Sequence, residues 1–143
     1  MNNNIIHNNS VTLADDAFIQ TLKNLLELIQ GMVSRNHDLE YICTIIKDAE
    51  KIHIAKITAS GTDVTEKIIM QIRHNTILSL SLAYSTGVIL YITASERVTG
   101  EEIDNIISAV CGLVPIEAQI VFDMNSGETI QDDLNVIIAS TKK

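Results

Sequence analysis

The residues best placed to do chemistry lie in one short polar stretch, which reads RNHDLEY and runs into an apolar, helix-like segment. An Asn or Asp just before a helix accepts hydrogen bonds from the first backbone N–H groups, so Asn36 and Asp38 fit a helix N-cap. The second interpretation is a loop that presents the carboxylate of Asp38, with His37, Leu39 and Tyr41 beside it, to a partner. The two interpretations are compatible, because a capping carboxylate can also contact a second molecule.

The remaining reactive groups do not follow a recognised catalytic or metal-binding pattern. They are His7, His37, His53, His74, Cys43 and Cys111. No H-E-x-x-H or C-x-x-C occurs, so neither a metal site nor a disulfide framework is predicted. The six glycines form neither G-x-G nor G-K-[ST], and no G-x-S-x-G elbow is present. We therefore expect no cofactor, no metal and no active site assembled from one chain.

Length and charge narrow the classes of function. The 143 residues are 46% hydrophobic, enough for one domain that builds its own core. Ten basic against eighteen acidic residues give a net charge of −8, which opposes binding to nucleic acid. No signal-peptide pattern and no bilayer-length apolar run is found, which predicts a cytoplasmic protein that does not associate with membranes.

Hydrophobic periodicity predicts an α+β fold. Residues 1–11 are Asn-rich and expected to be disordered, and a single domain is expected over residues 12–141. Two N-terminal helices, one long from Thr12 and a second from Leu39 to Lys51, precede a four-stranded mixed sheet with packed helices. The strands are expected at residues 51–58, 87–93, 118–123 and 134–139, and the last two could form a hairpin.

Two capping signals mark the starts of helices inside this domain. Asp63 followed by Glu66, and Thr99 followed by Glu102, both resemble a capping box. Gly112 with Pro115 just beyond it is a typical helix stop.

A resemblance to a known family emerges from the stretch that contains Asn36 and Asp38. The chain reads N-H-D-L-E-Y-I-C-T-I-I, which resembles the pattern N-x-D-F-A-D-V-x-T-[IV]-M of FtsZ, the bacterial tubulin homologue. Further fragments follow in the family's order: ITASG resembles G-E-A-S-G, TGVILYIT resembles R-G-V-L-V-N-I-T, TGEEI resembles T-L-x-E-V, AQIVF resembles A-N-I-I-F, and DLNVIIAST resembles D-x-I-R-V-T-V-I-A-T. Together they span nearly all of residues 12–141.

The resemblance covers the family's long central helix and C-terminal domain. It implies four strands with helices, in agreement with the element order above. The glycine-rich signature of the family's GTP-binding domain has no counterpart in these 143 residues. The expectation is therefore an FtsZ-like protein without the GTPase domain.

The resemblance also gives the polar loop a role. In the family this loop enters the nucleotide pocket of the next subunit, and two acidic residues help to polarise the water that attacks GTP. Asn36 and Asp38 match the first two motif positions, but the second acid falls on Tyr41, whose ordinary pKa near 10 rules out a carboxylate's role at neutral pH. Glu40 is adjacent, yet one helical step turns its side chain about 100° away. The catalytic pair is expected to be broken, so the protein is predicted not to be an enzyme.

Two function classes remain open at this point, with a third beside them. The first is a non-enzymatic, FtsZ-like interaction module that caps or modulates the assembly of a full-length FtsZ-type subunit through residues 36–41. The alternative is a self-associating or small-ligand-binding α+β domain with no filament role. In the self-associating form it would be a homo-oligomer. The third is a small enzyme whose site forms between identical chains.

Overall fold

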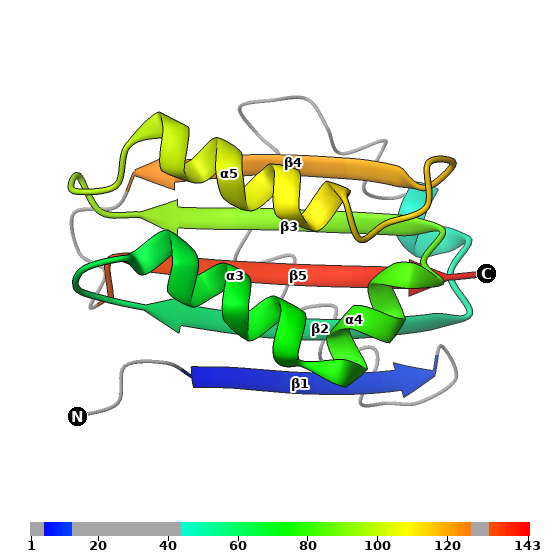
Figure 1. Cartoon of the computed structure of the whole chain (residues 1–143). Helices are drawn as coiled ribbons and strands as arrows, with labels where there is room; N and C mark the ends of the chain where they lie inside the picture. The colour runs from blue at the N-terminus through cyan, green and yellow to red at the C-terminus, as the bar shows by residue number, and fades with distance from the viewer. Residues whose placement is uncertain (1–4, 13–43, 127–131) are drawn as a thin grey trace.

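The computed structural model describes residues 5–12, 44–126 and 132–143. In chain order, its strands and helices are β1 Ile5–Thr12, β2 Lys51–Ala59, α3 Val64–His74, α4 Thr76–Ala83, β3 Gly87–Ala94, α5 Gly100–Cys111, β4 Gln119–Ser126 and β5 Leu134–Lys142 (Figure 1). Thr12, the predicted start of the long helix, is instead the last residue of β1, and the rest of that predicted helix lies outside the described residues. Of the second predicted helix, residues 44–51 are described, and only residues 44–47 are helical. The predicted end at Lys51 is wrong, because Lys51 already begins β2.

The strands form one mixed sheet in the order β1-β2-β5-β3-β4. β2 and β3 both pair antiparallel with β5, while β3 and β4 pair in parallel. The α+β class and the four predicted strands are confirmed. The predicted hairpin between the last two strands is wrong, because β5 inserts between β2 and β3. All but two of its nine residues are buried, and a strand that is apolar on both faces is stable only in the middle of a sheet.

The N-terminal segment differs from its expected disorder. Ile5–Thr12 forms β1, which pairs antiparallel with β2 from Ile5 opposite Thr58 to Thr12 opposite Lys51. Polar Asn residues within the segment suggested disorder, but a strand at a sheet edge needs backbone hydrogen bonds more than apolar side chains. Among the described residues the sheet therefore has five strands instead of four.

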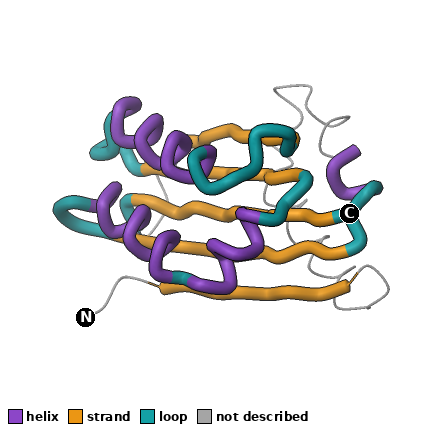
Figure 2. The backbone as a smooth tube through the Cα atoms, turned by 45° about the vertical axis from the view of Figure 1, so that its right-hand side comes forward, coloured by secondary structure: helices purple, strands orange, loops and turns teal. Residues whose placement is uncertain are grey.

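The helices α3, α4 and α5 cover one face of the sheet, as Figures 1 and 2 show. Their buried side chains meet alternate residues of β2, β3 and β5 in one large cluster. Its largest fully buried members include Ile57, Ile68, Ile72, Leu78, Leu82 and Leu90. A second cluster lies on the opposite face, where Ile45 packs with Ile89, Tyr91 and Ile137. Both faces are therefore apolar and buried, which accounts for the nearly continuous hydrophobic run of β3.

The start of α5 follows local sequence rules, whereas the start of α3 does not. Thr99 and Glu102 form the predicted capping box, with the Glu102 N–H donating to Thr99 Oγ1 at 3.2 Å. The predicted capping box at Asp63 is wrong. Asp63 adopts the left-handed conformation with φ of 54°, and its side chain makes no capping hydrogen bond.

A carboxylate distant in sequence holds the turn before α3. The Gly61 N–H donates to Asp133 Oδ2 at 2.9 Å, and Ser95 Oγ donates to the other oxygen at 3.0 Å. Ser60 Oγ donates to Asp132 at 2.9 Å. The hydrogen bond from Gly61 is the largest cause that lowers the pKa of Asp133. This network joins the ends of β2 and β3 to the start of β5 and fixes the turn that leads into α3.

His53 of β2 is an uncompensated polar group in this sheet. Its side chain is 4% exposed, and neither ring nitrogen has a hydrogen-bond partner in the described part of the chain. It lies opposite Ser10 of β1 and Ser140 of β5, and the hydroxyl of Ser140 is hydrogen-bonded to that of Ser81 on α4. Burial lowers the pKa of His53 because the imidazolium form loses its hydration.

The second cluster provides a test of the central strand. Ile89 is 1% exposed, and we expect Ile89→Ala to lower the free energy of unfolding by about 2–5 kcal/mol through lost burial and a residual cavity. Ile116, 95% exposed, is the control, and Ile116→Ala should change stability by less than about 0.5 kcal/mol. Urea unfolding measures both. Equal effects of the two changes would contradict the central position of β3.

His53 should make stability depend on pH. As pH falls, the unfolded chain binds a proton on this residue near its ordinary pKa of about 6.5, while the folded chain does so only at lower pH. Stability should therefore be full well above about pH 6.5 and decrease as the pH falls through and below that value. His53→Leu should flatten this decrease in denaturant titrations. If the exposed His74→Gln variant flattens it instead, His53 is not the responsible group.

Candidate functional site

The site residues expected from the sequence are Asn36, His37, Asp38, Leu39 and Tyr41, and all five lie outside the described residues. The structure therefore leaves their predicted role untested. A different feature stands out in the part that the structure describes, a cavity at the end of the sheet where β5 terminates and β3 and β4 begin.

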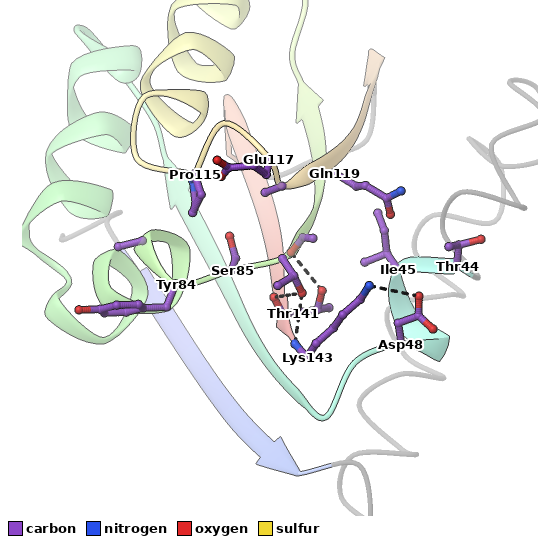
Figure 3. A pocket seen from close by; sticks show the side chains of 14 residues that line it. Thr44, Ile45, Asp48, Tyr84, Ser85, Pro115, Glu117, Gln119, Thr141 and Lys143 are labelled. Carbon is purple, nitrogen blue, oxygen red and sulfur yellow. Dashed lines mark hydrogen bonds and ion pairs between the residues drawn. The ribbon is translucent and has the colours of Figure 1, made fainter.

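The cavity has a volume of about 520 Å³. Four segments that are far apart in sequence surround it, as Figure 3 shows: the helical turn before β2, the connection from α4 to β3, the loop before β4, and the end of β5. Its lining comprises Thr44, Ile45, Asp48, Ala83, Tyr84, Ser85, Thr86, Gly87, Pro115, Glu117, Ala118, Gln119, Thr141 and Lys143.

A dense set of hydrogen bonds forms the cavity wall. The Thr86 N–H donates to Thr141 O at 2.7 Å, and the Gln119 N–H donates to Thr86 O at 3.1 Å. Thr141 Oγ1 donates to Gly87 O at 3.2 Å, and the Lys143 N–H donates to Thr86 Oγ1 at 3.2 Å. The backbone and hydroxyl groups are thus largely used to join β3, β4 and β5, which makes the wall stable but leaves it few directed groups for a ligand.

The charged groups around the cavity interact weakly. Lys143 Nζ lies 3.6 Å from Asp48 Oδ2, with both side chains about half exposed or more, so this ion pair contributes little to stability. Lys142 Nζ stands 5.5 Å from the centroid of the Tyr84 ring, within the range of a cation–π contact. Glu117 adds a second carboxylate to the lining.

This arrangement suits reversible binding better than catalysis. The hydroxyl of Ser85 donates to Leu82 O at 2.8 Å, and none of the described residues that line the cavity is a histidine that could act as a base for a nucleophile. No group of three or more His, Cys, Asp or Glu residues within the described ranges could hold a metal ion. None of the helices described there is long and apolar enough to cross a membrane.

Sequence reasoning did not find the cavity. Its polar positions, such as Ser85, Thr86 and Thr141, follow no motif, because they gather only when β5 comes to lie beside β3. The one local signal is Gly87 at the start of β3, read from the sequence only as part of an apolar run.

Exposed apolar side chains form a second class of candidate surface. On α4, Ile77, Leu80 and Tyr84 recur at helical spacing and are 58%, 55% and 64% exposed. At the edge of the sheet, Phe122 and Met124 of β4 are 51% and 42% exposed. Apolar groups gathered in this way are typical of protein-binding surfaces.

Comparison with known proteins supports the resemblance found in the sequence. No protein-family model matches the chain. It is 25% identical over 132 residues to the cell division protein FtsZ of Mycoplasmopsis pulmonis (strain UAB CTIP), a match that covers 92% of this chain and 34% of that protein. The chain thus spans about a third of the length of this curated relative.

Solved structures with a similar fold include two of FtsZ from M. jannaschii. An empty FtsZ dimer matches with a TM-score of 0.63 and 14% identity, covering 73% of this chain and 30% of that one. A point mutant of FtsZ matches with a TM-score of 0.63 and 15% identity, covering 87% and 40%. The predicted likeness to an FtsZ C-terminal domain is confirmed, and so is the predicted fold class.

The cavity wall leads to a test of Gly87. A Cβ at this position would lie 2.6 Å from Ile45 Cγ2 and 2.8 Å from Thr141 Oγ1, so Gly87→Ala should destabilise the domain by about 1–3 kcal/mol. At Gly100, in the first turn of α5, a Cβ would meet nothing within 4 Å, and Gly100→Ala should be neutral or stabilise by up to about 1 kcal/mol. Thermal unfolding of the two variants compares them. Equal melting temperatures would show that the helical turn does not pack closely on β3.

Proposed function

We propose that this FtsZ-like C-terminal domain is a non-enzymatic interaction module of the cell-division or cytoskeletal filament class, which docks on an FtsZ-type subunit in the cytoplasm and modulates its assembly. The extent of the similarity to FtsZ is the observation that carries this proposal. Because the match covers 92% of the chain, it has to include residues 36–41. The loop that resembles the family's docking loop therefore lies inside the similar region.

The loop composition supports docking without catalysis. Asn36 and Asp38 retain the polar groups that the resemblance assigns to contact with a neighbouring subunit, and Tyr41 replaces the second acid. A docked copy would supply one carboxylate to the partner's nucleotide pocket where the reaction uses two. Hydrolysis of GTP at that interface should therefore be slow.

Heterologous contacts explain how such a module would act on a filament. A filament grows when each subunit offers two complementary surfaces, one at each end. A polypeptide of these 143 residues offers the loop surface but contains no glycine-rich phosphate loop. Bound to a subunit, it would occupy a position from which growth cannot continue on that side.

A second candidate function rests on the cavity. A volume of about 520 Å³ with a mixed polar and apolar lining falls in the size range of small-molecule sites. It supports the alternative of a small-ligand-binding domain with no filament role. A ligand that raises the melting temperature of wild type but not of Gln119→Ala would favour this alternative over docking.

Filament assembly tests the main proposal. Substoichiometric amounts of the 143-residue polypeptide should shorten filaments of full-length M. pulmonis FtsZ formed with GTP, measured by electron microscopy and pelleting. Asp38→Ala and Leu39→Glu should weaken this effect, since they alter the docking loop. Glu101→Ala, which removes an exposed carboxylate from α5, is the matched control and should act as wild type does.

The Tyr41→Asp variant tests whether the missing second carboxylate accounts for slow GTP hydrolysis at the docked interface. It should restore part of the GTP turnover at the capped interface without restoring elongation. If filaments are unaffected at equimolar polypeptide, or if Leu39→Glu shortens them as well as wild type does, docking through this loop is wrong.

A further inference from the structure

The outer edge of β4 has no neighbouring strand in the described part of the chain. In the described part of the chain β4 pairs only with β3, and it is the last strand of the sheet on that side (Figure 1). The Gln119 N–H donates to Thr86 O, so the backbone groups of Gln119 point toward β3. Because backbone direction alternates along a strand, those of Ile120, Phe122 and Met124 point outward.

One outward backbone group of β4 bonds to a nearby side chain, as is typical of an edge strand without a neighbour. The Met124 N–H donates to the side chain of the neighbouring Asp123 at 2.7 Å instead of to another strand. Soluble proteins protect such edges with Lys, Pro or a bulge. The sequence of β4, QIVFDMNS, contains neither Lys nor Pro, and its pairing with β3 runs without a bulge from Gln119 to Ser126.

Side chains at the same positions are apolar and exposed. Ile120 lies opposite Val88 in the parallel ladder and packs partly against the helix-covered core. Phe122 and Met124 follow on the same face of β4, 51% and 42% exposed. Of the outward positions Ile120, Phe122, Met124 and Ser126, the first three therefore also present an apolar side chain on the face of the sheet that the helices cover.

We propose that β4 pairs antiparallel with β4 of a second copy of this chain, about a twofold axis at Phe122. Phe122 then faces the partner's Phe122, and Ile120 faces the partner's Met124. Of the four outward positions of β4, Ile120, Phe122 and Met124 form hydrogen-bonded pairs with one another. They can do so because hydrogen-bonded and non-hydrogen-bonded pairs alternate along an antiparallel ladder, and these residues are spaced two apart. The pairing continues the sheet across two copies.

Charge disfavours the neighbouring register that has its axis at Asp123. That register would still pair outward-pointing residues with one another, but it would put the two Asp123 carboxylates directly opposite each other. A register in which outward-pointing residues face inward-pointing ones cannot form the ladder of hydrogen bonds. With the axis at Phe122, Asp123 faces the partner's Val121, and the two carboxylates are offset. The apolar residues meet one another, which is the favourable cross-strand arrangement.

A second copy fits this edge better than an unrelated strand. A twofold rotation about Phe122 places the apolar residues Ile120, Phe122 and Met124 opposite the same three apolar residues of the second copy. The interface is confined to one eight-residue strand, so the dimer should be weak, with a dissociation constant between micromolar and millimolar. Each chain carries a charge of −8, so added salt should strengthen association by screening the repulsion.

Sedimentation of the purified 143-residue chain from about 10 µM to 1 mM should show a monomer–dimer equilibrium. Phe122→Asp should weaken dimerisation at least about tenfold, since it removes the central pair and places like charges on the axis. Ile116→Asp, an equally drastic change at an exposed residue just before β4, should leave it unchanged. Melting curves confirm that both variants fold.

Disulfide trapping tests the register in a background with Cys43→Ser and Cys111→Ser. Phe122→Cys should cross-link with itself, because Cα atoms of a hydrogen-bonded pair lie about 5.5 Å apart, within disulfide reach. Met124→Cys should not cross-link alone, since two such residues would lie roughly 13 Å apart along the strands. It should cross-link when mixed with Ile120→Cys.

Three outcomes would overturn the proposal. They are a chain that stays monomeric throughout this range, a dimer indifferent to Phe122→Asp, and open-ended growth, which would indicate pairing of β4 with β1 of the next copy. None of these experiments contains FtsZ, so their failure is distinguishable from failure of the proposed docking.

Discussion

The burial of β5 on both faces is the constraint on which the rest of the structure depends. Its residues from Val136 to Thr141 are all buried, so the strand requires a neighbour on each edge and a layer on each face. It obtains β2 and β3 as neighbours, the helices α3, α4 and α5 on one face, and Ile45 of the second cluster on the other. The final segment of the chain thereby organises segments that precede it by as many as ninety residues.

Each end of β5 then has its own consequence. At its start, Asp133 accepts hydrogen bonds from Gly61 and Ser95 and holds the turns that leave β2 and β3. At its end, Thr141 bonds to the first residues of β3, and the cavity opens beside them. The polar groups at both ends satisfy the backbone where strands stop, which explains why hydroxyls and carboxylates gather at these two places.

The same sheet leaves β4 as an edge, and this connects the fold to association. Placing β5 in the centre moves β4 to the outside, with Phe122 and Met124 exposed. In a protein that resembles part of FtsZ, the resemblance leads us to propose contact with another subunit at residues 36–41, whereas the structure draws attention to an edge about eighty residues further along. The two proposed surfaces involve different residues and would use different physical forces, directed polar contacts in the first and strand pairing in the second.

Local patterns in the sequence were sufficient for the elements and for the family resemblance. The alternation and apolar runs of residues 51–58, 87–93, 118–123 and 134–139 identified four strands, and Thr99 with Glu102 identified the start of α5, because periodicity and capping act over a few residues. Strand order, the pairing of β1, the cavity and the turn at Asp63 were decided only in the tertiary structure. A local pattern could not reveal them, since the partner that satisfies Gly61 lies 72 residues away at Asp133, and the position of β5 follows from burying both its faces at once.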